Sequence, residues 1–124
     1  YTSVGSYGNP AIVKDSRKFC FQRHIAHLKP NHEVINIVFL HAIMASPLVT
    51  WQADRFAIGA AQETLNLKVI KAFKVFLPSM KVQNKFAERV VIIEQQKVIA
   101  QKRLERSEEL FNSLLQKACK GELV

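Results

Sequence analysis

The sequence predicts an α+β chain, in which a small mixed domain is followed by one long α-helix that forms a coiled coil. No Gly or Pro occurs between Ser79 and Lys120, although the chain contains four of each, and both residues weaken or break helix interiors. The preceding residues instead mix turn signals, short β-branched runs and longer apolar runs, which is typical of a mixed domain. We therefore expect one domain over residues 1–78 and a helical one over residues 79–124.

The first part of the mixed domain is expected to be turns and extended chain. Residues 5–10 hold two Gly and an Asn-Pro pair, which predict a turn that leads into a short strand at residues 11–13. Residues 15–18 form a polar turn, and residues 19–29 are extended until Pro30 stops them.

Three helices and one further strand are expected next. The apolar run over residues 32–45 is too long for an ordinary strand and indicates a buried helix. Ser46 and Pro47 provide an N-cap and a first helical position for a second helix through about residue 56. After a loop at residues 59–62, Thr64 caps a short helix through about residue 72, and residues 74–77 form an apolar strand.

The long helix has the spacing of a coiled coil. Ser79 is its expected N-cap and Gly121 its expected C-cap, and at 1.5 Å per residue it would be about 63 Å long. From residue 86 onward, positions alternately four and three apart are apolar except Lys97 and Ser107, while the flanking positions are largely charged. The apolar positions of this seam are Phe86, Val90, Ile93, Ala100, Leu104, Phe111, Leu114 and Ala118.

Such a seam needs a partner, because a domain of residues 1–78 would be only about 30 Å across. The sequence therefore predicts a homodimer formed through the long helix. The alternative is a surface helix that lies on a larger domain. The two halves of the helix have the same net charge, so net charge leaves the strand direction open.

Basic residues concentrate in the segment from Lys14 to Lys29, which we call the basic segment. The chain has a formal net charge of +8, and such a patch suits a polyanion, with a solvated loop as the alternative. The candidates for phosphate contact are Lys14, Arg17, Lys18, Arg23 and Lys29. The candidates for polar or base-edge contact are Tyr7, Asn9, Gln22 and Gln62, and turn packing is the competing interpretation for Tyr7 and Gln62.

The sequence gives no sign of catalysis, because it lacks Gly-x-Ser-x-Gly, phosphate-loop and dinucleotide-binding motifs. His24 and His27 would point to opposite faces of an extended segment, so we expect no metal and no cofactor. No apolar run approaches the roughly 20 residues of a membrane span. The two cysteines lack CxxC spacing, which favours reduced thiols in a cytoplasmic protein.

Three stretches resemble the specificity subunits of type I DNA restriction-modification systems. The first is similar to the latter half of a target recognition domain, the second to the Leu-Pro-x-Leu-x-x-Gln start of a conserved-region helix, and the third to the end of that helix. They comprise Gly5 to Val13 with Phe19 to Asn31, then Gly59 to Gln62 with Leu65 to Gln83, and finally Leu110 to Leu123. Met80 stands where the family has Leu, and Cys119 stands where an aromatic residue is common.

The resemblance implies a non-catalytic reader of double-stranded DNA that corresponds to the C-terminal part of a specificity subunit. In that family, antiparallel helices hold two recognition domains apart, and each domain contacts half of a bipartite target. The helices also bind methyltransferase subunits, and the endonuclease subunit joins the complex. A chain with a single domain would then pair as an antiparallel homodimer. The alternative function is a basic coiled-coil adaptor whose first domain binds protein rather than DNA.

Overall fold

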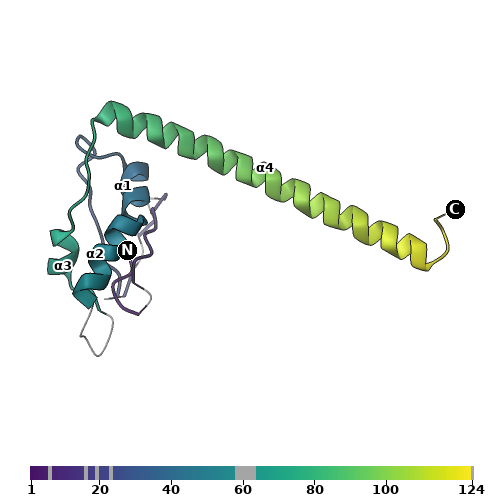
Figure 1. Cartoon of the computed structure of the whole chain (residues 1–124), viewed down its shortest axis with the longest axis horizontal. Coiled ribbons are helices and arrows are strands. Elements are labelled where there is room, and N and C mark those ends of the chain that lie inside the picture. Colours follow the sequence, from purple (N-terminus) through teal and green to yellow (C-terminus); the bar gives the residue numbers. More distant parts are fainter. Residues whose placement is uncertain (6, 16, 19, 23, 58–63, 124) are drawn as a thin grey trace. The chain divides into compact units, whose positions relative to one another are not determined.

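The computed structural model describes residues 1–123 except residues 6, 16, 19, 23 and 58–63 (Figure 1). The described part contains the helices α1 (Ile37–Met44), α2 (Pro47–Ala57), α3 (Leu67–Ala72) and α4 (Met80–Cys119). The contacts divide the chain into two units, Tyr1–Ala87 and Glu88–Val124. The first two turns of α4 therefore belong to the first unit.

The long helix is confirmed, whereas the predicted α+β class is not. Among the described residues, β pairing is limited to two isolated antiparallel bridges, Thr2 with Ile25 and Val4 with Thr64. Neither residues 11–13 nor residues 74–77 form a ladder. At Lys74 the side-chain amide of Gln52 takes the place of a partner strand: it accepts from the Lys74 N–H at 2.8 Å and donates to the Lys74 carbonyl at 3.0 Å. An apolar run becomes a strand only where a neighbour offers aligned backbone groups.

Local capping explains why two helices begin later than predicted. The Asn36 side chain accepts from the N–H groups of Val38 and Phe39, so α1 begins at Ile37, five residues after the predicted start. Similarly, Asn66 accepts from the Val69 N–H at 3.0 Å, and Asn66 rather than Thr64 is the N-cap of α3. A capping side chain thus outweighs the apolar pattern in placing a helix start.

The core of the first unit lies between its N-terminal segment and the three short helices. Its buried apolar residues are Tyr1, Ala26, Met44, Val49, Ala53, Leu65 and Ile70. The Tyr1 and Phe73 rings meet edge to face at 6.4 Å. The N-terminal segment is therefore part of the packed core.

The side chain of Gln83, which is fully buried, connects the start of α4 to the rest of the first unit by hydrogen bonds. Its amide oxygen accepts from the Asn36 N–H at 2.8 Å. Its amide nitrogen donates to the carbonyls of Pro78 at 2.8 Å and Val34 at 3.2 Å. One turn further along, the Phe86 ring lies edge to face against Phe39 of α1, at 5.6 Å.

The end of α4 follows the predicted cap. Gly121 has a φ of +73°, its N–H donates to Ala118, and the Glu122 N–H donates to the Lys117 carbonyl at 2.9 Å. These two bonds form a Schellman motif, in which glycine at the left-handed position ends the helix. The helix extends for 40 residues, about 60 Å at 1.5 Å per residue.

Candidate nucleic-acid interface and helix seam

The described residues of the basic segment are exposed except Ala26, which belongs to the core, and they form no regular element apart from the bridge at Ile25. Lys14, Lys18 and Lys29 are all exposed. Each can present an ammonium group to an anion, which is the contact that a phosphate backbone requires.

Arg17 differs from these lysines because it is already paired. Its Nη2 and Nε atoms donate to Asp15 Oδ2 at 2.7 and 3.0 Å, and its backbone N–H donates to Asp15 Oδ1 at 3.1 Å. These bonds to the Arg17 side chain and backbone lower the pKa of the Asp15 carboxyl. A phosphate would have to compete with Asp15 for Arg17, so we expect Arg17 to contribute less than the lysines.

The candidates for polar or base-edge contact differ in their hydrogen bonds and in their exposure. The Tyr7 hydroxyl donates to Asp54 Oδ1 of α2 at 2.6 Å, an arrangement in keeping with the turn-packing interpretation. The Asn9 N–H donates to Thr2 Oγ1 at 3.0 Å, while the Asn9 residue itself is exposed. Gln22 is exposed as well. Arg23 and Gln62 lie outside the described residues, and all four base-contact assignments remain predictions.

A pocket of about 490 Å³ lies between several segments of the first unit, and we refer to it as the hollow. It is bordered by residues 10–13, by residues 25–30 at the end of the basic segment, and by part of α1. Its lining is mostly apolar, with His27, His32, His41 and Lys29 as its basic groups. Lys29 borders this hollow directly, and so does Val13, the residue that precedes Lys14.

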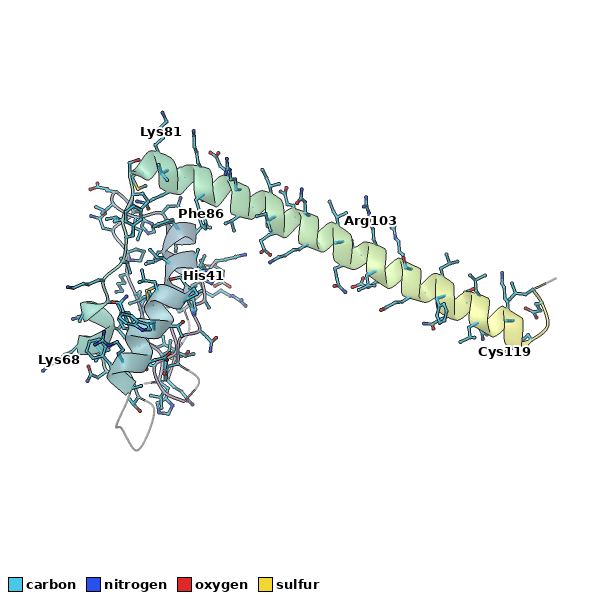
Figure 2. All side chains as sticks on the ribbon, in the orientation of Figure 1. His41, Lys68, Lys81, Phe86, Arg103 and Cys119 are labelled. Atoms are coloured by element: carbon cyan, nitrogen blue, oxygen red, sulfur yellow. The ribbon has the colours of Figure 1, made fainter. Side chains whose placement is uncertain are left out.

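The seam is open to solvent along the second unit. Ile93, Leu104 and Phe111 have exposed fractions of 50%, 52% and 65%, and side chains project from α4 along its whole length (Figure 2). Phe86 is a special case, because part of its ring is covered by Phe39. The homodimer role of the seam residues remains a prediction.

Sequence reasoning gave no role to Gln83, although this residue closes the Leu77 to Gln83 motif that carries the family resemblance. The structure shows that it is the polar anchor between α4 and the residues before α1. The Leu-Pro-x-Leu-x-x-Gln spacing, which places Gln83 shortly after Pro78, is the signal that could have pointed to it.

The described residues offer little for other site types. They contain no group of three or more His, Cys, Asp or Glu residues that could hold a metal ion. Within the same residues, no helix combines the length and apolar character needed to cross a membrane. Cys20 and Cys119 are exposed free thiols.

Comparison with known proteins supports the resemblance found in the motifs. The chain is 33% identical over 129 aligned positions to the type I restriction enzyme EcoBI specificity subunit of Escherichia coli. The alignment covers 98% of this chain but only 27% of that subunit, so the chain spans about a quarter of the relative's length. No family model and no solved structure matches the chain. The predicted resemblance is thus confirmed: nearly the whole chain is similar to a part of a type I restriction specificity subunit.

Proposed function

We propose that this chain is a non-catalytic DNA-recognition component of a type I restriction-modification complex. The observation that carries the proposal is the similarity of 98% of the chain to a specificity subunit. In this role the first unit contacts one part of a bipartite site on double-stranded DNA. The chain then directs methyltransferase and endonuclease subunits to that site, in the cytoplasm.

The exposed lysines support the DNA contact. Lys14, Lys18 and Lys29 lie within a basic segment of a chain with a net charge of +8. Each neutralised phosphate releases condensed counterions, which makes binding favourable and dependent on salt. Phosphate contacts of this kind fix the position of a protein on the duplex, while polar side chains such as Gln22 are available for base edges.

The open seam supports pairing of two copies. Large apolar side chains at Ile93, Leu104 and Phe111 remain half exposed in the second unit, and burying them against a second helix removes that surface from water. A homodimer gives two recognition units, which is the number that a bipartite site requires.

A competition assay tests the DNA role against the adaptor alternative. Fluorescence anisotropy would measure binding of the chain to a labelled duplex, with polyglutamate as competitor. We expect the duplex to bind, and the triple variant Lys14→Gln, Lys18→Gln, Lys29→Gln to bind at least tenfold more weakly. The matched control changes three lysines elsewhere in the first unit: Lys68→Gln, Lys71→Gln and Lys74→Gln.

Two results would contradict the proposal. One is equal loss of affinity in the control triple variant, which would show that the basic segment has no special part in binding. The other is failure to bind duplex DNA while labelled polyglutamate, tested in a parallel titration, does bind, which would favour the protein adaptor.

A further inference from the structure

The hollow of the first unit is bordered by two extended segments whose backbone groups are unpaired. Residues 10–13 and residues 25–30 both line it, and no turn or bend interrupts residues 10–13 or residues 26–30. Within the described part of the chain, the backbone N–H and C=O groups of residues 11–13 and 27–29 make no hydrogen bond. Two segments at the hollow therefore present backbone groups to which a further strand could bond.

The pairing that already exists shows which of these groups lie on one edge. Tyr1 and Ala26 exchange two backbone hydrogen bonds, of 2.8 and 3.2 Å, and Thr2 and Ile25 form the adjoining antiparallel bridge. In an antiparallel ladder the bonding groups on one edge recur at every second residue. The N–H and C=O groups of Leu28 therefore belong to the same edge as those of Ala26, one step beyond the pair with Tyr1.

The lining of the hollow requires an occupant with apolar side chains. Val13, Phe21, Ile25 and Leu28 all border the hollow, and their exposed fractions are 55%, 47%, 42% and 37%. Removing such surface from water is favourable. Water alone can satisfy the unpaired backbone groups, but it leaves these side chains exposed.

The charge of the lining requires an acidic occupant. The described lining residues include Lys29, His27, His32 and His41 but no Asp or Glu. His41 Nε2 lies 3.2 Å from the Pro10 carbonyl oxygen, which connects residues 10–13 to α1. Carboxylates are the groups that complement such a lining electrostatically.

We propose that the hollow binds an extended segment of another polypeptide, in which apolar and acidic side chains alternate, as an added antiparallel β-strand. One residue of this segment exchanges two hydrogen bonds with Leu28. Its side chain lies on the same face as that of Leu28 and is apolar, because directly opposite residues of a ladder share a face. The residues on either side of it lie opposite His27 and Lys29 and are acidic.

A strand accounts for more of the site than a small molecule does. The volume of about 490 Å³ is within the range of small-molecule pockets, and a small apolar anion would match the lining. It would nevertheless leave the row of backbone groups at residues 27–29 without partners. In strand addition the main-chain hydrogen bonds provide affinity, and pockets for alternate side chains provide specificity.

Synthetic peptides test the binding mode. The probe is a fluorescent form of the blocked hexapeptide Ac-Glu-Val-Glu-Val-Glu-Val-NH₂, titrated with the full chain by anisotropy. The matched control, Ac-Glu-Glu-Glu-Val-Val-Val-NH₂, has the same charge and composition without the alternation. A second analogue carries N-methyl groups on its valines, so it keeps the side chains but loses the donors. We expect each to bind about tenfold more weakly than the probe, as loss of one or two hydrogen bonds implies.

Substitutions at Leu28 separate its backbone from its side chain. Leu28→Pro removes the N–H and should weaken binding of the probe about tenfold. Leu28→Ala keeps the N–H and should weaken it by no more than about threefold. Urea unfolding followed by Trp51 fluorescence shows whether both variants are folded.

Hydrogen exchange of the parent chain gives a readout that needs no variant. Saturating probe should slow exchange of the Leu28 amide about tenfold or more, while the amides of His27 and Lys29, which belong to the other edge, keep their rates. Equal slowing at all three residues, or at none, would contradict strand addition at Leu28.

Three further results would overturn the proposal. The first is equal binding of the probe and either control peptide, which would show that alternation or the backbone donors have no part. The second is displacement of the probe by decanoate, which would make the hollow a site for small apolar anions. The third is protection of the Leu28 amide that grows with the concentration of the chain alone, which would make a second copy the occupant. DNA affinity enters none of these measurements, so the proposal stands or fails apart from the DNA role.

Discussion

Replacing the buried Gln83 with leucine removes three hydrogen bonds while changing side-chain volume little. The groups that lose their partner are the Asn36 N–H and the carbonyls of Pro78 and Val34. A hydrogen bond contributes about 0.5–1.5 kcal/mol net. The bond to the Val34 carbonyl is the longest of the three, at 3.2 Å, and contributes least. We therefore expect Gln83→Leu to destabilise the first unit by about 2–3 kcal/mol.

Trp51 makes this loss measurable, because it is the only Trp in the chain and lies in α2. Urea unfolding followed by its fluorescence should show a lower midpoint with an unchanged slope. For a domain of this size the melting temperature should fall by about 8–24 °C. Gln95→Leu, at an exposed position of α4, is the matched control and should stay within about 0.5 kcal/mol of the parent.

A glutamate at position 83 refines the test. It can still accept from the Asn36 N–H, but when ionised it cannot donate to the two carbonyls. Gln83→Glu should therefore be less stable than Gln83→Leu at neutral pH and should partly recover in acid, when the carboxyl is protonated. If Gln83→Leu unfolds within 0.5 kcal/mol of the parent, the assignment of Gln83 as the anchor of α4 is wrong.

Three further predictions concern the basic segment, the seam and specificity. Because Arg17 lowers the pKa of the Asp15 carboxyl, Arg17→Gln should return that pKa toward its ordinary value of 3.8 in an NMR titration. The Arg17–Asp15 pair stabilises the chain at pH values above this ordinary pKa, and its contribution is lost as the pH falls through the lowered pKa. A pKa of Asp15 that is the same in the variant and the parent would show that the pair does not form. Ile93→Lys with Leu104→Lys should give monomers by light scattering, since both changes put charge into the seam, and a parent chain that is itself monomeric would refute the seam. The chain alone should bind random duplexes almost equally and neither methylate nor cleave DNA when magnesium, ATP and S-adenosylmethionine are supplied, whereas enrichment of one bipartite sequence from a duplex library would contradict this.

The long helix could be predicted because its signals are local. The absence of Gly and Pro and the cap at Gly121 depend only on neighbouring residues, and α4 ends where the cap predicts. The strands could not be predicted in the same way, since strand formation depends on a partner that the pattern does not reveal. At Lys74 that partner is the side chain of Gln52 rather than another strand.

The candidate site likewise has features that the sequence could predict and features that depend on three-dimensional contacts. The basic segment was visible as a cluster of charges, and the exposure of its lysines follows from their charge. The pairing of Arg17 with Asp15 and the burial of Gln83 arise from three-dimensional geometry. From residue type alone, Arg17 would be taken as an unpaired cation and Gln83 as a surface residue. The structure shows instead that Arg17 is paired with Asp15 and that Gln83 is buried.

The dependence of DNA affinity on salt tests the central claim most directly. The logarithm of the association constant for a duplex, plotted against the logarithm of salt concentration, should fall linearly, and each of Lys14→Gln and Lys18→Gln should reduce the slope by about 0.9. Arg17→Gln should change it less, because Asp15 already holds the guanidinium. An affinity that does not change with salt, or slopes unaltered by both lysine substitutions, would contradict DNA recognition through the basic segment.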